Sequence, residues 1–384
     1  MSLLFWILVF IGAFLCSYYC ILIASYCYAW QKMKEPERSV AVDVFVSVIV
    51  AARNEEVTIA KCLDAILSQN YLVENFEILV VNDHSTDATA SIIKSYSDKH
   101  KRIRFLQLPE SIIGKKQAIQ MAIEIAKGEL IITTDADCVM EKKWLISIAT
   151  FYKKTQAKMI VAPVCFFKEN TFFEKMQSLE FMALMTCGGA SLHFNKSIMC
   201  NGANLAYSKE AFLEVGGFNG IDNKASGDDV LLMYKISEKH PNAVKFLKTE
   251  DAIVCTLAQK TLKGFVQQRK RWASKGFGAL NAETKRVSLV VYLFCFYLVF
   301  MPFLGGVCLS NTPFYLPFMK ICLILFGIKC FIDFLLLFLS ASFFKKKRYL
   351  LLFIPEQIIY IWYVVVFGML GSLGKYEWKG RNTN

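Results

Sequence analysis

Hydrophobic positions along the chain follow two patterns, and each pattern predicts a different kind of structure. Residues 3–30 and most of 288–373 are apolar almost without interruption, whereas residues 40–280 alternate short apolar runs with amphipathic segments. The first stretch has no charged residue and exceeds the roughly 20 residues that a helix needs to cross a bilayer. We therefore expect an N-terminal transmembrane anchor over 1–30, a globular domain over 40–280, and a membrane region over 288–373 followed by a tail, 374–384.

The middle domain shows strands and helices in alternation. Apolar, β-branched runs predict strands at Val44–Val50, Glu77–Val81, Ile103–Leu108 and Leu130–Thr134. Between them, apolar residues recur at helical spacing: Ile59, Leu63, Ile66 and Leu67 first, then the segments Ala88–Tyr96 and Lys115–Ala126. This alternation is typical of an α/β fold with a mainly parallel sheet and helices on both faces.

Polar side chains follow the predicted strands at the point where each strand ends. Arg53 and Glu55 come after the first strand, Asp83 after the second, and Asp135 and Asp137 after the fourth. In open α/β sheets, ligands bind in the crevice beyond the carboxyl ends of the strands. The regular placement of these groups predicts a ligand site at that edge.

The Asp135-Ala136-Asp137 tripeptide suits a divalent cation. Side chains two residues apart in an extended segment lie on the same face, and paired carboxylates are ligands that Mg²⁺ and Mn²⁺ prefer. A solvated turn after a strand is the plainer alternative. Neither G-x-G-x-x-G nor G-x-x-x-x-G-K-[ST] occurs in the chain, which argues against a dinucleotide enzyme or a P-loop NTPase.

A second acidic pair, Asp228-Asp229, precedes an apolar helical run. One carboxylate there can cap the helix, while the other can face a cleft and act as a general base, for which we prefer Asp229. Lys115 opens a predicted helix, and it is either a solvated surface lysine or a contact for a diphosphate.

The segment from Gln268 to Trp272 reads Gln-Arg-Lys-Arg-Trp and precedes an apolar stretch. It fits a juxtamembrane amphipathic helix. Arg271 also offers bidentate phosphate recognition, and Trp272 offers a flat surface for a sugar or a lipid. Gln268 and Trp272, four residues apart, would share one helix face.

Composition and charge agree with a membrane protein. The hydrophobic fraction of 55% exceeds that of ordinary soluble proteins. The net charge of +12 arises from basic residues that cluster beside the apolar segments, which favours anionic lipid headgroups over nucleic acid as the partner. Thirteen scattered cysteines without paired spacing predict small buried side chains and neither disulfides nor a zinc site.

Basic residues also predict the topology. Lys32, Lys34 and Arg38 follow the first apolar stretch, so the positive-inside rule places the middle domain in the cytoplasm. Ser288–Leu309 and Pro313–Phe343 predict two further spans. The third apolar stretch, Tyr349–Leu373, is interrupted at Pro355, and it either crosses the membrane or forms a hairpin or interfacial segment.

Taken together, residues 44–275 resemble the family 2 inverting glycosyltransferases of GT-A fold. The resemblance rests on an opening strand and turn over 48–56, Asp83 within Val-Asn-Asp-His-Ser-Thr-Asp, the D-x-D at 135–137, the Gly-Ala-Asn turn at 202–204, Gly-Asp-Asp at 227–229, and Gln-x-x-Arg-Trp at 268–272. It implies single-displacement transfer from a UDP-sugar, assisted by Mg²⁺ or Mn²⁺. The roles it implies are donor contacts from Ala51, Arg53, Glu55, Asp83, Lys115, Asp135 and Arg271, metal ligation by Asp135 and Asp137, a base at Asp229 beside Asp228, and acceptor contacts from Gly202, Asn204, Gln268 and Trp272.

The acceptor stays open at this point. The chain is similar to small bacterial lipid-directed, ceramide glucosyltransferase-like and polysaccharide synthase-like members, which implies a lipid or glycan acceptor at the cytoplasmic membrane. The few spans favour a lipid acceptor over processive polymer synthesis. The tail ending Trp-Lys-Gly-Arg, 378–381, resembles that of lipid-directed relatives and favours the hairpin. A distant alternative is a non-catalytic nucleotide-binding transport protein, to which Lys320, Lys329 and Asp333 would contribute a membrane path.

Overall fold

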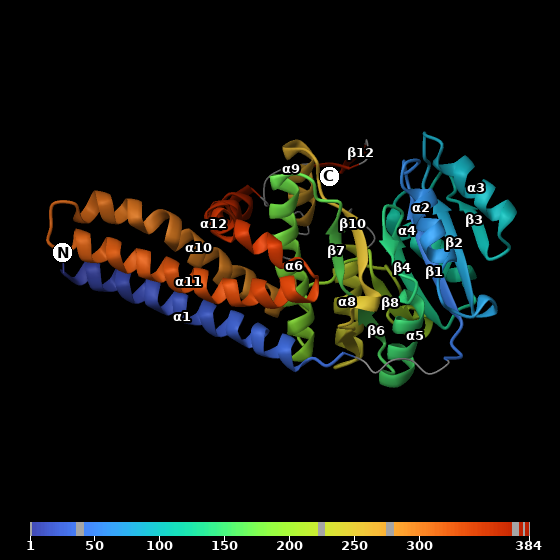
Figure 1. Ribbon diagram of the computed structural model, residues 1–384, viewed down its shortest axis with the longest axis horizontal. Helices are drawn as coiled ribbons and strands as arrows, with labels where there is room; N and C mark the ends of the chain where they lie inside the picture. Colours follow the sequence, from blue (N-terminus) through green and yellow to red (C-terminus); the bar gives the residue numbers. More distant parts are fainter. Residues whose placement is uncertain are drawn as a thin grey trace.

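The structure is a computed structural model that describes residues 2–35, 42–221, 227–273, 280–370, 376–378 and 381–383. It has two parts that lie end to end along the long axis, an α/β domain and a bundle of long helices (Figure 1). Part of the predicted tail, 374–384, lies outside the described residues, including Lys379 and Gly380. Within it, two short strands pair antiparallel, β11 (Tyr376–Trp378) and β12 (Arg381–Thr383).

A seven-stranded sheet forms the centre of the α/β domain, in the order β3-β2-β1-β4-β8-β6-β9. Strands β1 to β4 are mutually parallel, as predicted, whereas β8 runs antiparallel to both β4 and β6. The strands are β1 (Val46–Ala52), β2 (Phe76–Asn82), β3 (Ile103–Gln107), β4 (Leu130–Asp135), β6 (Met159–Val161), β8 (Leu205–Ser208) and β9 (Val244–Phe246). Every residue of β2 is buried, so the sheet is covered on both faces.

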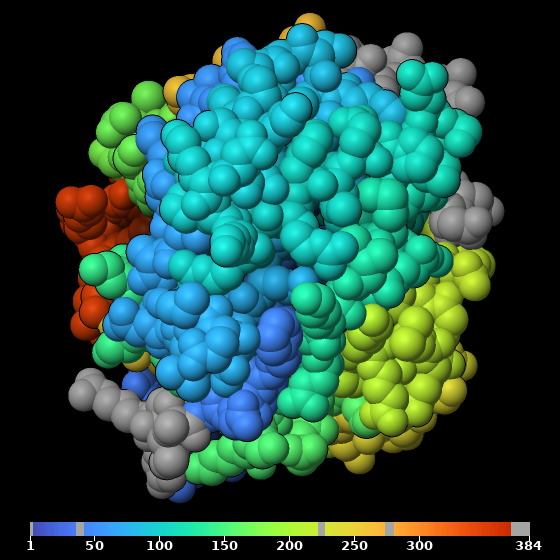
Figure 2. Space-filling view, turned by 90° about the vertical axis from the view of Figure 1, so that its right-hand side faces the viewer, coloured from blue at the N-terminus to red at the C-terminus, as the bar shows by residue number. Residues whose placement is uncertain are grey.

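Helices cover this sheet because each presents an apolar stripe to it. In α2, the buried side chains Ile59, Cys62, Leu63 and Ile66 recur at helical spacing. Seen from the end of the domain, the surface is formed mostly by the blue-to-teal elements β1 to α4, with the yellow-green chain around α7 and α8 beside them (Figure 2). The helices are α2 (Ile59–Leu67), α3 (Thr89–Lys99), α4 (Lys115–Ile125), α5 (Trp144–Thr155), α7 (Lys209–Glu214) and α8 (Asp228–Lys239), with short 3₁₀ turns at Val73–Asn75 and Glu250–Ala252.

A second, three-stranded sheet has the order β5-β10-β7 and lies between the main sheet and the helical bundle (Figure 1). It consists of β5 (Val139–Met140), β7 (Val164–Phe167) and β10 (Val254–Leu257). Beyond it runs α6 (Phe172–His193), whose side chains are buried around most of its circumference, and α9 (Leu262–Ala273) lies at the same level. Helix α6 begins with a capping box between Thr171 and Glu174 that satisfies its first backbone N–H groups.

Four helices of the described chain are long and apolar enough to cross a membrane. Helices α1 (Ser2–Lys32), α10 (Ala282–Leu309) and α11 (Tyr315–Phe343) run side by side along the long axis (Figure 1). After a 3₁₀ segment at Lys347–Leu352, α12 (Phe353–Leu370) packs against α10 and α11 at a different angle, and its later turns contact α9 through Tyr363 and Phe367. The predicted spans are thus present as helices, and the last of them takes a direction of its own.

Candidate active site

The carboxyl ends of β2, β1 and β4 lie at one edge of the main sheet. Strand register aligns Ala51 with Asp135, and Ala52 with Asn82, so the residues that follow each strand meet there. The guanidinium of Arg53 donates through Nη1 to the backbone oxygens of Asp83 and His84, at 2.8 and 2.9 Å. Parallel pairing therefore assembles the polar groups that the sequence scatters over more than 80 positions.

These groups line one cleft of about 380 Å³, which we call the strand-end cleft. It is bounded by the strand ends, the beginnings of α4 and α8, the loop before β8, and helices α6 and α9. The predicted site residues that line it are Ala51, Arg53, Glu55, Asp83, Lys115, Asp135, Asp137, Gly202, Asp228, Asp229, Gln268, Arg271 and Trp272.

Asn204 is the one predicted site residue that does not line the cleft. It is fully buried: its Oδ1 accepts from the Trp144 indole at 2.9 Å, and its Nδ2 donates to the backbone oxygens of Pro163 and Ala252, each at 2.8 Å. The prediction that Asn204 contacts an acceptor is therefore corrected. The side chain instead ties the start of β8 to the loops around the second sheet.

Asp135 and Asp137 offer a divalent cation a chemically suitable pair of ligands. Their carboxylate oxygens and the sulfur of Cys138 lie within 4.8 Å of one another. Burial, together with the charges of Asp137 and Asp135, raises the pKa of the Cys138 thiol well above its ordinary value, so the hard oxygen ligands are the relevant ones. Thr256 on β10 donates to Asp137 Oδ2 at 3.1 Å and orients that carboxylate.

Lys115 is the cation that faces these acids. Its Nζ lies 2.5 Å from Asp135 Oδ1 and 4.0 Å from Asp228 Oδ2. Burial opposes its charge, but Asp135, Asp228 and Asp229 outweigh that cost and raise the pKa of the ammonium above its ordinary value. Lys115 thus stays charged and links the Asp135–Asp137 side of the cleft to the acids of α8.

Asp229 is held at the start of α8 by backbone donors. Its Oδ2 accepts from the N–H of Gly202 at 3.0 Å, and its Oδ1 from its own helix at Val230 N, at 2.8 Å. A side chain at Gly202 would crowd the cleft, because its Cβ would lie 3.3 Å from the Lys115 nitrogen and 3.4 Å from Asp229 Cβ. Gly227 takes a φ of 88°, which only glycine adopts at little cost, and turns the chain into the helix.

Helix α9 presents two different faces. Gln268, Arg271 and Trp272 line the cleft, and the Trp272 ring stacks on Phe181 of α6 with centroids 6.2 Å apart. The neighbouring Arg269 is 2% exposed, points away from the cleft, and pairs with Glu180 at 2.5 Å. Burial raises the pKa of the Glu180 carboxyl, although the charge of Arg269 acts in the opposite direction.

Sequence reasoning missed several of these contributors. Thr256 and the stacked pair Phe166–Phe181 touch the cleft from elements that carry no recognisable motif. The sequence does not single out Arg269, because it is one of three consecutive basic residues, 269–271. Residues two apart on a helix lie on different faces, so Arg269 and Arg271 point in different directions. The rings of Phe265 and Trp272 lie 4.6 and 4.2 Å from the Arg269 guanidinium. Their spacing of four and three residues from Arg269 is the sequence pattern that could have indicated this contact.

Comparisons with known proteins agree with this geometry. Residues 47–216 match the model of Glycosyl transferase family 2. A probable glycosyltransferase of Bacillus subtilis, YdaM, is 27% identical over 286 residues, covering 70% of this chain and 65% of the relative. A poly-beta-1,6-N-acetyl-D-glucosamine synthase of Staphylococcus epidermidis is 25% identical over 256 residues, covering 65% of this chain and 60% of the relative. The similarity thus spans under two thirds of the length of these relatives.

Among solved structures, the mannosyltransferase PcManGT of Pyrobaculum calidifontis, determined with GDP-Man and Mn²⁺, has a similar fold. The two share 18% identity and a TM-score of 0.57, over 95% of this chain and 99% of the other. The main sheet with its acidic strand ends is accordingly a GT-A core. The fold, the family match over residues 47–216 and these relatives all point to a glycosyltransferase domain of family 2 in this part of the chain.

Proposed function

We propose that the protein is a membrane-anchored inverting glycosyltransferase that moves a sugar from a UDP-sugar to a hydroxyl of a lipid or polysaccharide acceptor. One observation carries the proposal. A carboxylate held by backbone donors, Asp229, shares a single cleft with the acidic pair Asp135 and Asp137 and with the cation Lys115. Base, metal ligands and diphosphate contact are the three things that such a transfer requires.

The donor side is the edge formed by β1, β2 and β4. Asp83 is 2% exposed at the end of β2, where the nucleoside of the donor would lie, and Arg53 braces its backbone. Lys115 and Arg271 approach from α4 and α9 and would contact the diphosphate. A Mg²⁺ or Mn²⁺ ion on Asp135 and Asp137 would supply positive charge to the departing UDP.

Asp229 would act as the base. As the acceptor oxygen attacks the anomeric carbon, its proton passes to Asp229, and the bond from the anomeric carbon to UDP breaks with its electron pair leaving on UDP. Gly202 fixes the orientation of the carboxylate through its N–H, which is 3.0 Å away. Asp228 is the weaker candidate because its carboxylate faces Lys115 at 4.0 Å.

The acceptor would lie against α9. The buried Oε1 of Gln268 accepts no hydrogen bond within the part of the chain that the structure describes, so it is available to a hydroxyl donor. The Trp272 ring lines the cleft between Phe181 and the Arg269 guanidinium, and its exposed edge offers apolar contact to a sugar or a lipid headgroup. Both features fit an acceptor that is hydroxylated, and neither calls for nucleic acid.

The helices α1, α10 and α11 would anchor the protein in the cytoplasmic membrane as a multi-pass protein, with the transferase domain on the basic, cytoplasmic side. The contacts of α12 with α9, through Tyr363 and Phe367, support the interfacial arrangement of 349–373 over a full crossing. A processive polysaccharide synthase is the second candidate, which the Staphylococcus relative favours by name. Size analysis of the product separates it from single addition.

The transport alternative has less support. Lys329 and Asp333, which would have marked a path through the membrane, pair with each other at 2.6 Å inside the bundle. Their charges are therefore matched within the structure. The strand-end cleft, by contrast, gathers acids at the place where a GT-A core binds its donor.

The test compares the parent protein with Asp229→Asn in membranes supplied with UDP-sugars and Mn²⁺. Loss of a general base costs about 10²- to 10⁴-fold in rate, so we expect sugar transfer to fall by that factor while UDP-sugar binding persists. Asp98→Asn, on α3 and away from the cleft, serves as the matched control and should transfer like the parent. Undiminished transfer by the Asp229 variant would remove this residue as the base.

A further inference from the structure

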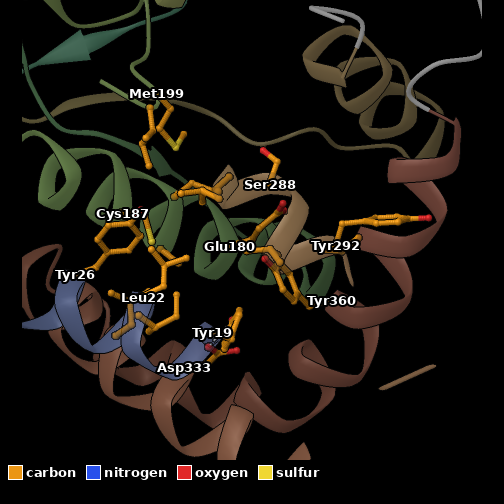
Figure 3. Close-up of a pocket in the computed structure, with 18 of the residues that line it drawn as sticks. Tyr19, Leu22, Tyr26, Glu180, Cys187, Met199, Ser288, Tyr292, Asp333 and Tyr360 are labelled. Atoms are coloured by element: carbon orange, nitrogen blue, oxygen red, sulfur yellow. Dashed lines mark hydrogen bonds between the residues drawn. The ribbon is translucent and has the colours of Figure 1, made fainter. Parts of the chain in front are cut away.

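A second cavity, of about 530 Å³, lies inside the helical bundle and adjoins the strand-end cleft. We call it the bundle cavity; α1, α6, α10, α11 and α12 all contribute to its walls (Figure 3). Its volume falls in the range of roughly 300–1,000 Å³ that small-molecule sites occupy. Leu22, Tyr26 and Cys187 lie together on one wall, and Tyr19 with Asp333 closes one end.

The bundle cavity meets the strand-end cleft at two residues. Leu184 of α6 and Met199, in the loop before β8, line both spaces. Met199 is three positions before Gly202, whose N–H holds the carboxylate of Asp229. Three residues span at most about 10 Å, so a molecule in the bundle cavity near Met199 lies within reach of the proposed base.

The bundle cavity also opens to the outside of the bundle, between α10 and α12. Leu289 and Gly368, which line it from α10 and α12, are exposed, whereas Leu22 and Tyr26 on α1 are buried. These α10 and α12 residues belong to helices that are apolar enough to lie in a membrane. The side opening thus faces the region where hydrocarbon chains would surround the bundle.

The charges around the bundle cavity select against an anion. Glu180, Asp333 and Glu356 line it, and no Lys, Arg or His is found among its lining residues in the described chain. The nearby cations are held by partners within the protein: Arg269 by Glu180, Lys329 by Asp333 and Gln357 at 2.6 Å each, and Arg286 by Glu283 at 2.7 Å. A phosphate-bearing headgroup would meet carboxylates here without a cation to balance it.

We propose that the bundle cavity holds the hydrocarbon part of an uncharged, hydroxyl-bearing membrane lipid, and that the lipid's hydroxyl reaches Asp229 past Leu184 and Met199. The walls supply apolar contact for the hydrocarbon chain, and the Ser288 hydroxyl supplies a donor and an acceptor for a hydroxyl group. This inference rests on the proposed function and deepens it, because it names the class of acceptor. It selects a neutral lipid over a phosphorylated isoprenoid and over a growing glycan.

The experiment uses the full-length protein in phosphatidylcholine vesicles that contain one of two photoactivatable probes, a diazirine diacylglycerol or a diazirine isoprenoid phosphate. Labelling of the protein is measured on irradiation, and sugar transfer to the same lipid is measured in parallel. Val287→Trp fills the cavity from α10, and Leu289→Trp narrows its side opening from an exposed position that tolerates bulk. Val307→Trp, on the same helix and 66% exposed, is the matched control.

We expect the diacylglycerol probe to label the parent and the control at residues that line the bundle cavity, and to label both filled variants about tenfold less. That factor corresponds to about two buried methylene groups lost. Thermal protection by UDP-sugar and Mn²⁺ identifies any variant whose transferase domain fails to fold, and Leu289→Trp then carries the comparison.

Equal labelling of parent and filled variants would overturn the inference, as would stronger labelling by the isoprenoid phosphate. A long soluble polymer made by the parent without lipid labelling would overturn it too, and would leave the transferase function standing. Labelling of the bundle cavity in a protein that neither binds nor turns over any UDP-sugar would instead contradict the proposed function.

Discussion

Charged side chains are used in opposite ways in the strand-end cleft and in the helical bundle. In the cleft, Lys115, Asp135 and Asp228 keep side-chain exposures of 24%, 38% and 19%, and carboxylates outnumber the lysine they face. In the bundle, Lys329 and Asp333 have exposures of 0% and 8%, and each oxygen of Asp333 is hydrogen-bonded, one to Lys329 and one to Tyr19 at 2.7 Å. The cleft thus keeps an excess of negative charge that a bound cation could balance, whereas the charges of Lys329 and Asp333 in the bundle balance each other.

The difference follows from the cost of an uncompensated charge in each place. Water can reach the cleft and screen excess negative charge until a cation and a diphosphate bind. Within apolar helices no such screening exists, so Lys329 is retained only with its full set of partners, which include Gln357 of α12. Charge imbalance at a solvent-accessible strand edge therefore points to a ligand, whereas a charge deep in a helix can have a purely structural role.

The different roles of the two lysines are tested most directly by the same Lys→Met substitution in both regions. Lys329→Met removes the cation and leaves Asp333 buried beside Tyr19, so we expect the free energy of unfolding to fall by about 3–5 kcal/mol. Unfolding in detergent, followed as a function of temperature or denaturant, measures the change. Lys320→Met, on the same helix at an exposed position, should leave stability nearly unchanged.

A double variant, Lys329→Met with Asp333→Leu, removes both charges and should recover much of the lost stability. If the single variant were as stable as the parent, or if it lost transfer without losing stability, the Lys329–Asp333 pair would have a functional role, and the contrast with the cleft would disappear.

Lys115→Met is the corresponding change in the cleft, and its effect should appear in catalysis. A hydrogen bond to a charged group contributes about 1.5–3 kcal/mol, so loss of the diphosphate contact predicts transfer lower by about 10- to 100-fold. Divalent-cation affinity should stay the same or rise, since Asp135 loses the competing ammonium at 2.5 Å. Titration with Mn²⁺ alongside UDP-sugar kinetics checks both; a fall in Mn²⁺ affinity would show that Lys115 supports the metal site structurally.

The cleft was the more predictable of the two regions. Strand ends in a parallel sheet meet at one edge, so Arg53, Asp83 and Asp135 could be brought together from the strand pattern alone. In the structure, Ala51 pairs with Asp135 and Ala52 with Asn82, and Arg53 donates to the backbone oxygen of Asp83. The prediction failed at Asn204 for a physical reason. A Gly-Ala-Asn turn fixes the local backbone, but the partner of the side chain, Trp144, lies 60 positions away and no local pattern reveals it.

The bundle cavity could not be predicted in this way. Apolar helices show their length but not which faces meet, and Glu180 of α6 lies about 150 positions before Asp333 and Glu356, which come from α11 and α12. The position of α6 was equally hidden: it reads as a buried helix with no strong stripe, because one side faces the cleft and the other the bundle cavity. Such faces are decided by packing between segments, which periodicity within one segment does not encode.

The contact between Lys346 and Glu169, where the α/β domain meets the helical bundle, is expected to have the smallest effect on stability of those tested. Lys346, just after α11, donates to the backbone oxygen of Phe166 at 2.5 Å, to Ser178 at 3.3 Å and to the carboxylate of Glu169. Burial opposes ionisation of Glu169, but its hydrogen bonds with Lys346 and Ser178 outweigh burial and hold its pKa below the ordinary value of 4.5. The folded protein therefore binds this proton less tightly than the unfolded chain does.

The stabilisation from this contact is present above pH 4.5 and is lost as the pH falls through the lowered pKa of Glu169. Glu169→Gln should therefore be less stable than the parent at about pH 6 and approach it at about pH 4 in unfolding measurements. Glu238→Gln, at an exposed position on α8, supplies the control for removal of a surface carboxylate. Parallel pH profiles for parent and Glu169→Gln would mean that the ionised Glu169–Lys346 contact adds nothing to the attachment between the two regions, which other contacts such as Ser340 to the backbone of Met182 would then supply.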